Sequence, residues 1–180
     1  MKTRIILGVL CLSSALLRAA DGAAENERRL AAEVPQVFAR AEAQARLLIK
    51  EMDARGVVTE LPRSWTRGTY KTEPPTGWTT GFFPGSLWYL YAYTQKPEWK
   101  AAAEAWTARL EPARHFTGNH DMGFMFFCSY GNGIKYGGHG DDYKAVIVDA
   151  ADALATRWSE KMGLIRSWDE PRFMQFPVII

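Results

Sequence analysis

The chain has 180 residues, 47% of them hydrophobic and 23% charged, and its formal net charge at neutral pH is +2. This length and composition suit a single domain with a buried apolar core. A net charge so close to zero argues against nucleic acid as a partner.

The first 20 residues are predicted to be a secretory signal peptide. Two basic residues precede an apolar stretch over residues 5–17, and small residues suited to cleavage follow between 19 and 24. The apolar stretch is too short to span a bilayer comfortably, although an uncleaved anchor is an alternative. Cleavage after Ala20 removes three of the 22 basic residues and none of the 20 acidic ones, so the charge of +2 becomes −1. We therefore expect an exported protein, periplasmic or extracellular, that carries no membrane segment once mature.

Beyond the signal peptide, the hydrophobic pattern predicts helices joined by turns, with no convincing strand. The first helix is expected over residues 35–54, with Pro35 near its start and Gly56 just past its end. A loop rich in Pro, Thr and Arg is expected over residues 61–76. Further helices are expected over residues 84–94, 97–110, 121–130 and 143–158. Such an alternation of helices and short turns indicates packed helical hairpins and an all-α fold.

This helical pattern predicts the position and role of several side chains. Asp121 is a candidate N-cap, and residues 131–133, Gly-Asn-Gly, are expected to end the helix that it begins. In the helix over residues 143–158, Asp149 lies off the apolar stripe and is expected to be solvated. The predicted members of this stripe are Ile147, Ala151, Leu154 and Trp158. The tryptophans expected in the core are Trp88, Trp99, Trp106 and Trp158.

Two short stretches place polar groups among aromatic residues where helices begin. They are GWTTGFFPG, residues 77–85, and NHDMGFM, residues 119–125. Such surroundings suit the binding of a sugar ring and the presentation of a carboxylate to it. Asp121 is therefore either a simple cap or a catalytic carboxyl, and Trp78 is either a sugar-stacking residue or a core aromatic. His120 is interpreted as a hydrogen-bonding neighbour, since the nearby histidines lack a zinc-binding spacing, and neither a metal nor a cofactor is predicted.

Five segments together resemble the unsaturated glucuronyl hydrolases, glycoside hydrolase family 88. The order and spacing of the segments match that family, and they extend over nearly all of the chain after the signal peptide. They are residues 78–91 (WTTGFFPGSLWYLY), 120–125 (HDMGFM), 129–133 (SYGNG), 165–169 (IRSWD) and 176–180 (FPVII).

This resemblance implies an (α/α)6 barrel of helical hairpins, of which residues 21–180 supply only about the first half. The implied reaction removes the unsaturated uronic acid from the non-reducing end of lyase-generated oligosaccharides by hydrating its C4=C5 vinyl ether. Asp121 matches the first catalytic aspartate of the family. The second would follow Ile180, so we expect this sequence to be a truncated portion of the catalytic domain. The residues expected to bind substrate are Trp78, His120, Arg166 and Trp168.

Two alternatives remain at this stage. The unsaturated rhamnogalacturonyl hydrolases share the barrel and the chemistry but act on pectin fragments. The WTTGFFPG and HDMGFM runs favour the glucuronyl family. The other alternative is an inactive truncated fragment with at most carbohydrate binding, because half a ring of hairpins exposes apolar helix faces.

Overall fold

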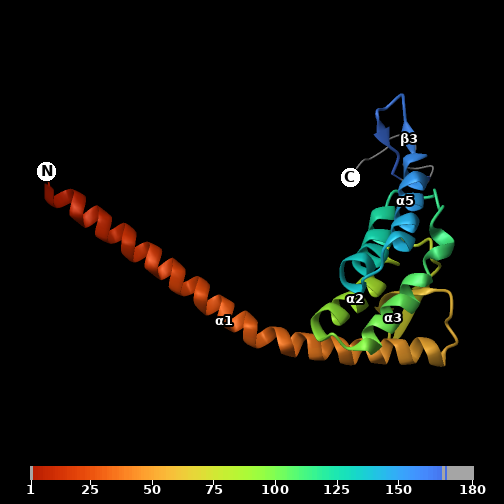
Figure 1. The fold of residues 1–180 in the computed structure, drawn as a ribbon, viewed down its shortest axis with the longest axis horizontal. Helices are drawn as coiled ribbons and strands as arrows, with labels where there is room; N and C mark the ends of the chain where they lie inside the picture. Colours follow the sequence, from red (N-terminus) through yellow and green to blue (C-terminus); the bar gives the residue numbers. More distant parts are fainter. Residues whose placement is uncertain (1, 168, 170–180) are drawn as a thin grey trace. The chain divides into compact units, whose positions relative to one another are not determined.

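The computed structural model describes residues 2–167 and residue 169, and it divides into a unit of residues 1–44 and a unit of residues 45–180. Residues 2–44 are helical and belong to helix α1, Lys2–Ala54 (Figure 1). Within the described residues no helix is both long and apolar enough to cross a membrane. The signal peptide over residues 1–20 stays a prediction, as does the domain boundary that follows it.

Helix α1 is longer than the sequence predicts. It was expected to begin near Pro35, yet Pro35 lies inside the helix. The residues before it are rich in Ala, Glu and Arg, which are strong helix formers. Ion pairs between Arg28 and Glu25 and between Arg29 and Glu33 join neighbouring turns of this stretch. Together they continue the helix through a proline whose fixed φ is compatible with helical geometry.

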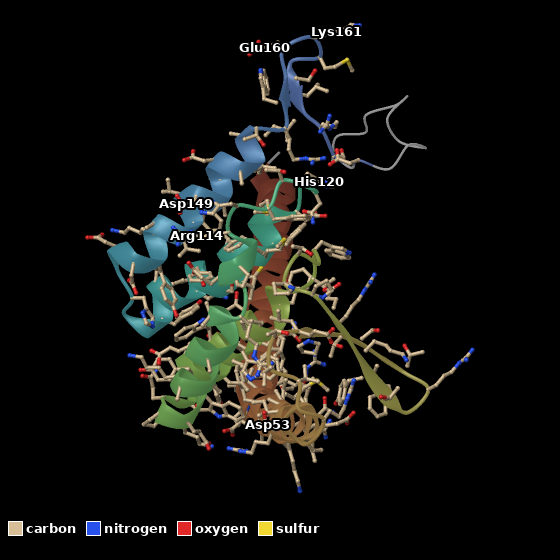
Figure 2. The ribbon with its side chains drawn as sticks, turned by 90° about the vertical axis from the view of Figure 1, so that its right-hand side faces the viewer. Asp53, Arg114, His120, Asp149, Glu160 and Lys161 are labelled. Atoms are coloured by element: carbon tan, nitrogen blue, oxygen red, sulfur yellow. The ribbon has the colours of Figure 1, made fainter. Side chains whose placement is uncertain are left out.

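The expected loop over residues 61–76 instead contains a β-hairpin. Strands β1, Leu61–Thr66, and β2, Thr69–Glu73, pair antiparallel. Their two-residue connection has Arg67 at φ 51° and Gly68 at φ 77°, the positive angles that a tight hairpin turn requires. The hairpin extends to one side of the helices (Figure 2). The prediction missed it because β1 is largely exposed and β2 is mostly polar, so no apolar alternation marks them.

Helices α2, Phe82–Thr94, and α3, Pro97–Ala108, form the helical hairpin that the sequence predicts. They pack against each other, with Trp88, Trp99 and Trp106 buried as expected. The indole N–H of Trp88 donates a hydrogen bond of 3.0 Å to the Thr107 hydroxyl, so the buried polar atoms of both residues are paired. A short 3₁₀ turn, η1, Glu111–Ala113, follows.

The segment after Asp121 forms a longer helical rod than predicted. It comprises α4, Met122–Phe126, and the π-helical turns η2, Phe127–Gly131, and η3, Gly133–Gly137. The Gly-Asn-Gly sequence therefore does not end the helix, and the rod ends at Gly138, which adopts φ 77°. The wider π turns accommodate two glycines against the Trp88 and Tyr143 rings, where a Cβ on Gly133 or Gly137 would collide.

Helix α5, Asp141–Ala155, packs against this rod and leads into two short paired strands, β3, Trp158–Ser159, and β4, Leu164–Ile165. Its buried face is one residue out of phase with the predicted stripe. The buried residues of α5 are Val146, Ala150 and Ala153. Trp158 is not a core residue, since it lies in β3 and is 49% exposed. Asp149 is not merely solvated either, because its carboxylate forms an ion pair with Arg114 (Figure 2).

The order of packing is α3, α2, the α4–η3 rod and α5. Close approach of α2 to the rod depends on two glycines spaced four residues apart. A Cβ on Gly81 would strike the carbonyl oxygens of Phe124 and Met125, and one on Gly85 would lie 2.6 Å from the Cys128 oxygen. The main chains of the two segments are thus in direct contact, which leaves no space for a side chain at positions 81 and 85.

We expect Gly81→Ala and Gly123→Ala to change stability in opposite directions. Alanine at position 81 has no space and must separate α2 from α4, at a cost of about 1–3 kcal/mol. An added Cβ at Gly123, on the exposed side of α4, meets nothing within 4 Å, so alanine there should stabilise by about 0.5–1 kcal/mol. Urea unfolding of both variants measures the effect, and equal effects at the two positions would contradict the packing argument.

Candidate active site

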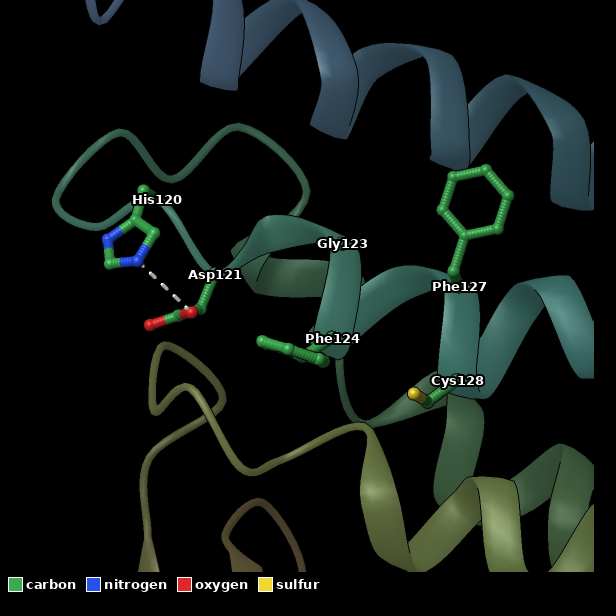
Figure 3. Close-up of a pocket in the computed structure, with 6 residues that line it drawn as sticks. All are labelled: His120, Asp121, Gly123, Phe124, Phe127 and Cys128. Carbon is green, nitrogen blue, oxygen red and sulfur yellow. Dashed lines mark ion pairs between the residues drawn. The ribbon is translucent and has the colours of Figure 1, made fainter. Parts of the chain in front are cut away.

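A pocket of about 540 Å³ opens at the start of α4 (Figure 3). This volume lies in the range of small-ligand sites. Its lining residues are His120, Asp121, Gly123, Phe124, Phe127 and Cys128. The pocket therefore combines a carboxyl and an imidazole with two aromatic rings, and all six residues belong to the stretch that follows residue 119.

Asp121 holds its carboxyl in this pocket without using it as a helix cap. It occupies the N-cap position of α4, but its side chain makes no capping hydrogen bond, so that part of the sequence prediction is wrong. The preceding turn is held instead by Asn119, whose side-chain oxygen accepts a 2.8 Å hydrogen bond from the Asp121 N–H. The Asn119 amide also donates to the Thr76 carbonyl at 3.3 Å, which joins this turn to the segment that carries Trp78.

His120 lies between Asp121 and the end of strand β4. Its Nε2 is 3.4 Å from Asp121 Oδ1, and its Nδ1 is 3.0 Å from the Ser167 carbonyl oxygen. A carbonyl oxygen can only accept a hydrogen bond, so Nδ1 must carry a proton. Both side chains are largely buried, at 16% and 13% exposed, so their contact is poorly screened by water. His120 is thus a close neighbour of Asp121, while its role in binding substrate stays a prediction.

Three aromatic rings form an exposed group beside the pocket. Trp78, Phe82 and Phe124 contact one another edge to face, with centroid separations of 5.8–6.4 Å. They are 45%, 40% and 51% exposed, so Trp78 is not a core aromatic. Because Phe124 also lines the pocket, the aromatic group is continuous with the surroundings of Asp121. Flat exposed rings next to a carboxyl suit the apolar face of a sugar.

Glu73 contacts the residues on either side of Trp78, Gly77 and Thr79, a role that the sequence did not reveal. Its side chain is almost buried and packs directly under Gly77, where any Cβ would collide with it. The Thr79 hydroxyl donates a hydrogen bond to Glu73 Oε1, and Arg63 Nε lies 3.7 Å from Oε2. Glu73, at the end of strand β2, thereby holds the Gly77–Thr80 turn. This role depends on a hairpin that the sequence does not predict, and no sequence motif marks it.

Cys128 is the other titratable side chain in the pocket, and it is half-buried. Burial raises the pKa of its thiol above the ordinary value, so the thiol is protonated and weakly nucleophilic near neutral pH. Among the described lining residues, the candidate acid–base groups are therefore Asp121 and His120.

The two remaining predicted binding residues lie near the end of the described chain. Arg166 follows strand β4, is 46% exposed at its side chain and pairs with Asp169 at 3.0 Å. It does not line the pocket, although its neighbour Ser167 contacts His120. Trp168 lies outside the described residues, as does the 176–180 segment. Their roles in binding substrate stay predictions.

Asp169 provides a pH-dependent contribution to the stability of this region. Hydrogen bonding to Arg157 holds the pKa of Asp169 below its ordinary value, and Arg166 lowers it further. Because folding lowers this pKa, the ion pair stabilises the fold above the ordinary pKa and loses its effect as the pH falls through the folded-state value. Asp169→Asn should therefore lower the melting temperature at about pH 6, and this difference should shrink as the pH falls below the ordinary pKa of an aspartate, about 3.9. A constant difference across that range, measured beside Asp152→Asn on α5, would contradict the assignment.

No cluster of three or more potential metal-ligating side chains occurs within residues 2–167 or at residue 169. His120 and Asp121 are adjacent, but a third His, Cys, Asp or Glu does not join them in that part of the chain. The pocket as described is thus a carboxyl–imidazole pair in aromatic surroundings.

The fold is that of the α/α barrels, since solved barrels of this type superpose on it. An unsaturated glucuronyl hydrolase specific for heparin aligns with a TM-score of 0.62 and 34% identity, over 74% of this chain and 36% of that one. The unsaturated glucuronyl hydrolase of Bacillus sp. GL1 aligns with a TM-score of 0.60 and 25% identity, over 78% and 37%. The predicted architecture, a portion of an (α/α)6 barrel, is confirmed, with two small β-hairpins added to the helices.

The particular proteins that the chain resembles are the unsaturated glucuronyl hydrolases. One from Formosa agariphila is 41% identical over 108 residues, which are 59% of this chain and 27% of that protein. An unsaturated chondroitin disaccharide hydrolase of Streptococcus pneumoniae is 34% identical over 99 residues, 53% of this chain and 24% of that protein. The chain thus spans about a quarter of the length of these curated relatives. The predicted resemblance is confirmed, and no family model matches the chain.

Proposed function

We propose that this protein is a glycoside hydrolase that removes the unsaturated uronic acid from the non-reducing end of oligosaccharides made by polysaccharide lyases. The observation that carries the proposal is the Asp121 carboxyl, which makes no capping bond and lies with His120 in a pocket bordered by exposed aromatic rings. A carboxyl beside rings that can pack on a sugar is the arrangement that glycan hydrolysis needs.

The proposed reaction is the hydration of a vinyl ether. A proton adds to C4, and water adds to C5 and gives up a proton, which leaves a hemiketal at C5. Opening of the hemiketal breaks the bond between C5 and the ring oxygen and gives a ketone at C5 and a hemiacetal at C1. Collapse of the hemiacetal to an aldehyde then releases the next sugar with its hydroxyl restored. Asp121 acts in this scheme as a carboxyl that donates or shares the proton or stabilises the positive charge that develops on the ring. His120 holds that carboxyl in place.

The substrate class is supported by the relatives. A variant of the Streptococcus agalactiae glucuronyl hydrolase, 27% identical to this chain, was solved as a complex with dGlcA-GalNAc6S. The Bacillus relative is described as responsible for the degradation of glycosaminoglycan. We extend this class, unsaturated glucuronyl disaccharides from glycosaminoglycans, to the present protein. The choice among heparin-type and chondroitin-type substrates follows from the test below.

The test uses the ultraviolet absorbance of the C4=C5 bond. Unsaturated disaccharides from heparin and chondroitin lyase digests should lose this absorbance when incubated with the protein, whereas the saturated disaccharides should release no sugar. An unsaturated rhamnogalacturonan disaccharide, tested in parallel, should react more slowly by at least about tenfold, which corresponds to about 1.4 kcal/mol of transition-state discrimination. A preference for that substrate would assign the protein to pectin degradation instead.

Absence of turnover with all three substrates would overturn the proposed hydrolase. Tryptophan fluorescence would then decide whether the protein binds carbohydrate without catalysis, because Trp78 is exposed beside the pocket. Quenching by the unsaturated disaccharide that is lost in Trp78→Ala would indicate a binding module.

A further inference from the structure

Arg157 is the most deeply buried charged side chain near the candidate active site, and neither the sequence motifs nor the proposed reaction uses it. Its side chain is 1% exposed, and it lies just after α5, before strand β3. Burying a guanidinium is costly unless every donor is paired. The donors of Arg157 are all paired, so its partners show which segments it joins.

The partners of Arg157 belong to two segments, one 9–12 residues after it and one 40 residues before it. Its Nε donates to the Arg166 carbonyl at 2.7 Å, and one terminal nitrogen donates to the Ser167 carbonyl at 2.8 Å. The other terminal nitrogen donates to the Thr117 carbonyl, in the loop that leads to Asp121. The Asp169 carboxylate accepts from both terminal nitrogens, at 3.1 and 3.2 Å, and balances the charge.

The Ser167 carbonyl connects this arrangement to the pocket. It accepts one hydrogen bond from Arg157 and lies 3.0 Å from His120 Nδ1, so both of its lone pairs face donors. With a proton held on Nδ1, the other imidazole nitrogen is the one that faces Asp121 Oδ1, at 3.4 Å. The hydrogen bond made by one ring nitrogen decides what the other can do.

We propose that Arg157 is a positioning residue that holds the Ser167 carbonyl against His120, keeps the proton of the neutral imidazole on Nδ1, and thereby leaves Nε2 as the ring nitrogen that faces the Asp121 carboxyl. The catalytic consequence rests on the proposed hydrolase function, whereas the imidazole tautomer does not.

A lysine could not take the place of Arg157. The guanidinium is planar and sends five donors in fixed directions, whereas an ammonium is a compact group with three rotatable donors. Three main-chain carbonyls and a carboxylate surround Arg157. Arg157→Lys keeps the positive charge but loses the planar set of five donors. The variant therefore separates the geometric role of Arg157 from its role in balancing charge.

The first experiment reads the tautomer directly by nitrogen-15 NMR of the imidazole rings. The chain contains only three histidines, so His115→Gln and His139→Gln assign the His120 signals by subtraction. In the wild-type protein, the neutral His120 ring should carry its proton on Nδ1. In Arg157→Lys it should become a mixture of the two tautomers. Asp169→Asn is the matched control, because it removes one partner of Arg157 but leaves all three carbonyl contacts, and it should keep the Nδ1 proton.

Two results would overturn the proposal. One is a wild-type His120 that carries the proton of its neutral ring on Nε2. This result is obtained with the wild-type protein alone, so it does not depend on whether any variant folds. The other is an unchanged tautomer in an Arg157→Lys protein that retains the wild-type backbone NMR spectrum, since the carbonyl would then not depend on the guanidinium.

The second experiment tests the link to catalysis. Arg157→Lys should lower kcat on the unsaturated disaccharide by about 10- to 100-fold with little change in KM, as expected for a misplaced catalytic group. A rise in KM with kcat unchanged would contradict a role in positioning Asp121. Failure of the wild-type protein to act on any unsaturated disaccharide would overturn the proposed function, while the tautomer measurement would still decide the role of Arg157.

Discussion

Asp121→Asn is expected to lower kcat on the unsaturated disaccharide by about 10²- to 10⁴-fold, the range that a positioned acid–base group contributes. The variant keeps the size and shape of the side chain but has no ionisable proton to share with His120. Little structural change should follow, because the Asp121 side chain makes no cap and the turn is held by Asn119 through the main chain. The effect should therefore appear in kcat rather than in stability.

The measurement compares kcat and the dissociation constant of the unsaturated disaccharide for wild type and variant. Binding should change by no more than a few fold, since the aromatic rings beside the pocket are unaltered. Asp152→Asn, an exposed aspartate on α5, is the control and should behave as wild type. Full activity in Asp121→Asn would exclude this carboxyl from the reaction and would contradict its proposed catalytic role.

Trp88→Ala should have the largest effect on stability, a loss of about 3–5 kcal/mol in the free energy of unfolding. Trp88 is fully buried in α2, and its ring packs against the rod at Gly133 and Gly137. Alanine would leave a cavity between helices and also an unpaired Thr107 hydroxyl, which is itself fully buried. Since α2 positions the Gly77–Gly85 segment, the pocket should be lost with it.

Urea unfolding, followed by far-ultraviolet circular dichroism, measures this loss. Trp65→Ala is a matched control, because Trp65 lies on strand β1, is 58% exposed and contacts mainly Tyr70, so its removal should cost about 1 kcal/mol or less. Similar losses at the two tryptophans would mean that the α2–rod contact is not the principal core.

Much of the helical architecture follows from local sequence. Helices α2 and α3 are marked by Pro97 at the start of α3 and by apolar residues at helical spacing, so their pairing was predicted correctly. The β1–β2 hairpin was not, because its strands are polar and its Arg67–Gly68 turn lacks the usual Asn-Gly signature. The helix through Gly131 and Gly133 was also missed, because the rings that pack on Gly133 and Gly137 come from α2 and α5.

The candidate site likewise has parts that the sequence predicts and parts that depend on tertiary packing. Asp121, His120 and Trp78 stand in short motifs, and the sequence by itself determined their identity, their neighbourhood and the family that they resemble. The supports of the site, Glu73 and Arg157, carried no such signal. Arg157 is 40 residues from Thr117, and His120 is 47 residues from Ser167.

Only the tertiary structure decided how Asp121 is held and what it faces. The support behind its neighbour His120 consists of main-chain oxygens, at Thr117, Arg166 and Ser167, which accept hydrogen bonds from Arg157 and which every residue type possesses. Sequence reports side-chain chemistry and local periodicity, whereas the direction of a carbonyl depends on how distant segments pack. The candidate residues for the chemistry could therefore be predicted from the sequence, and the hydrogen bonds around them could not.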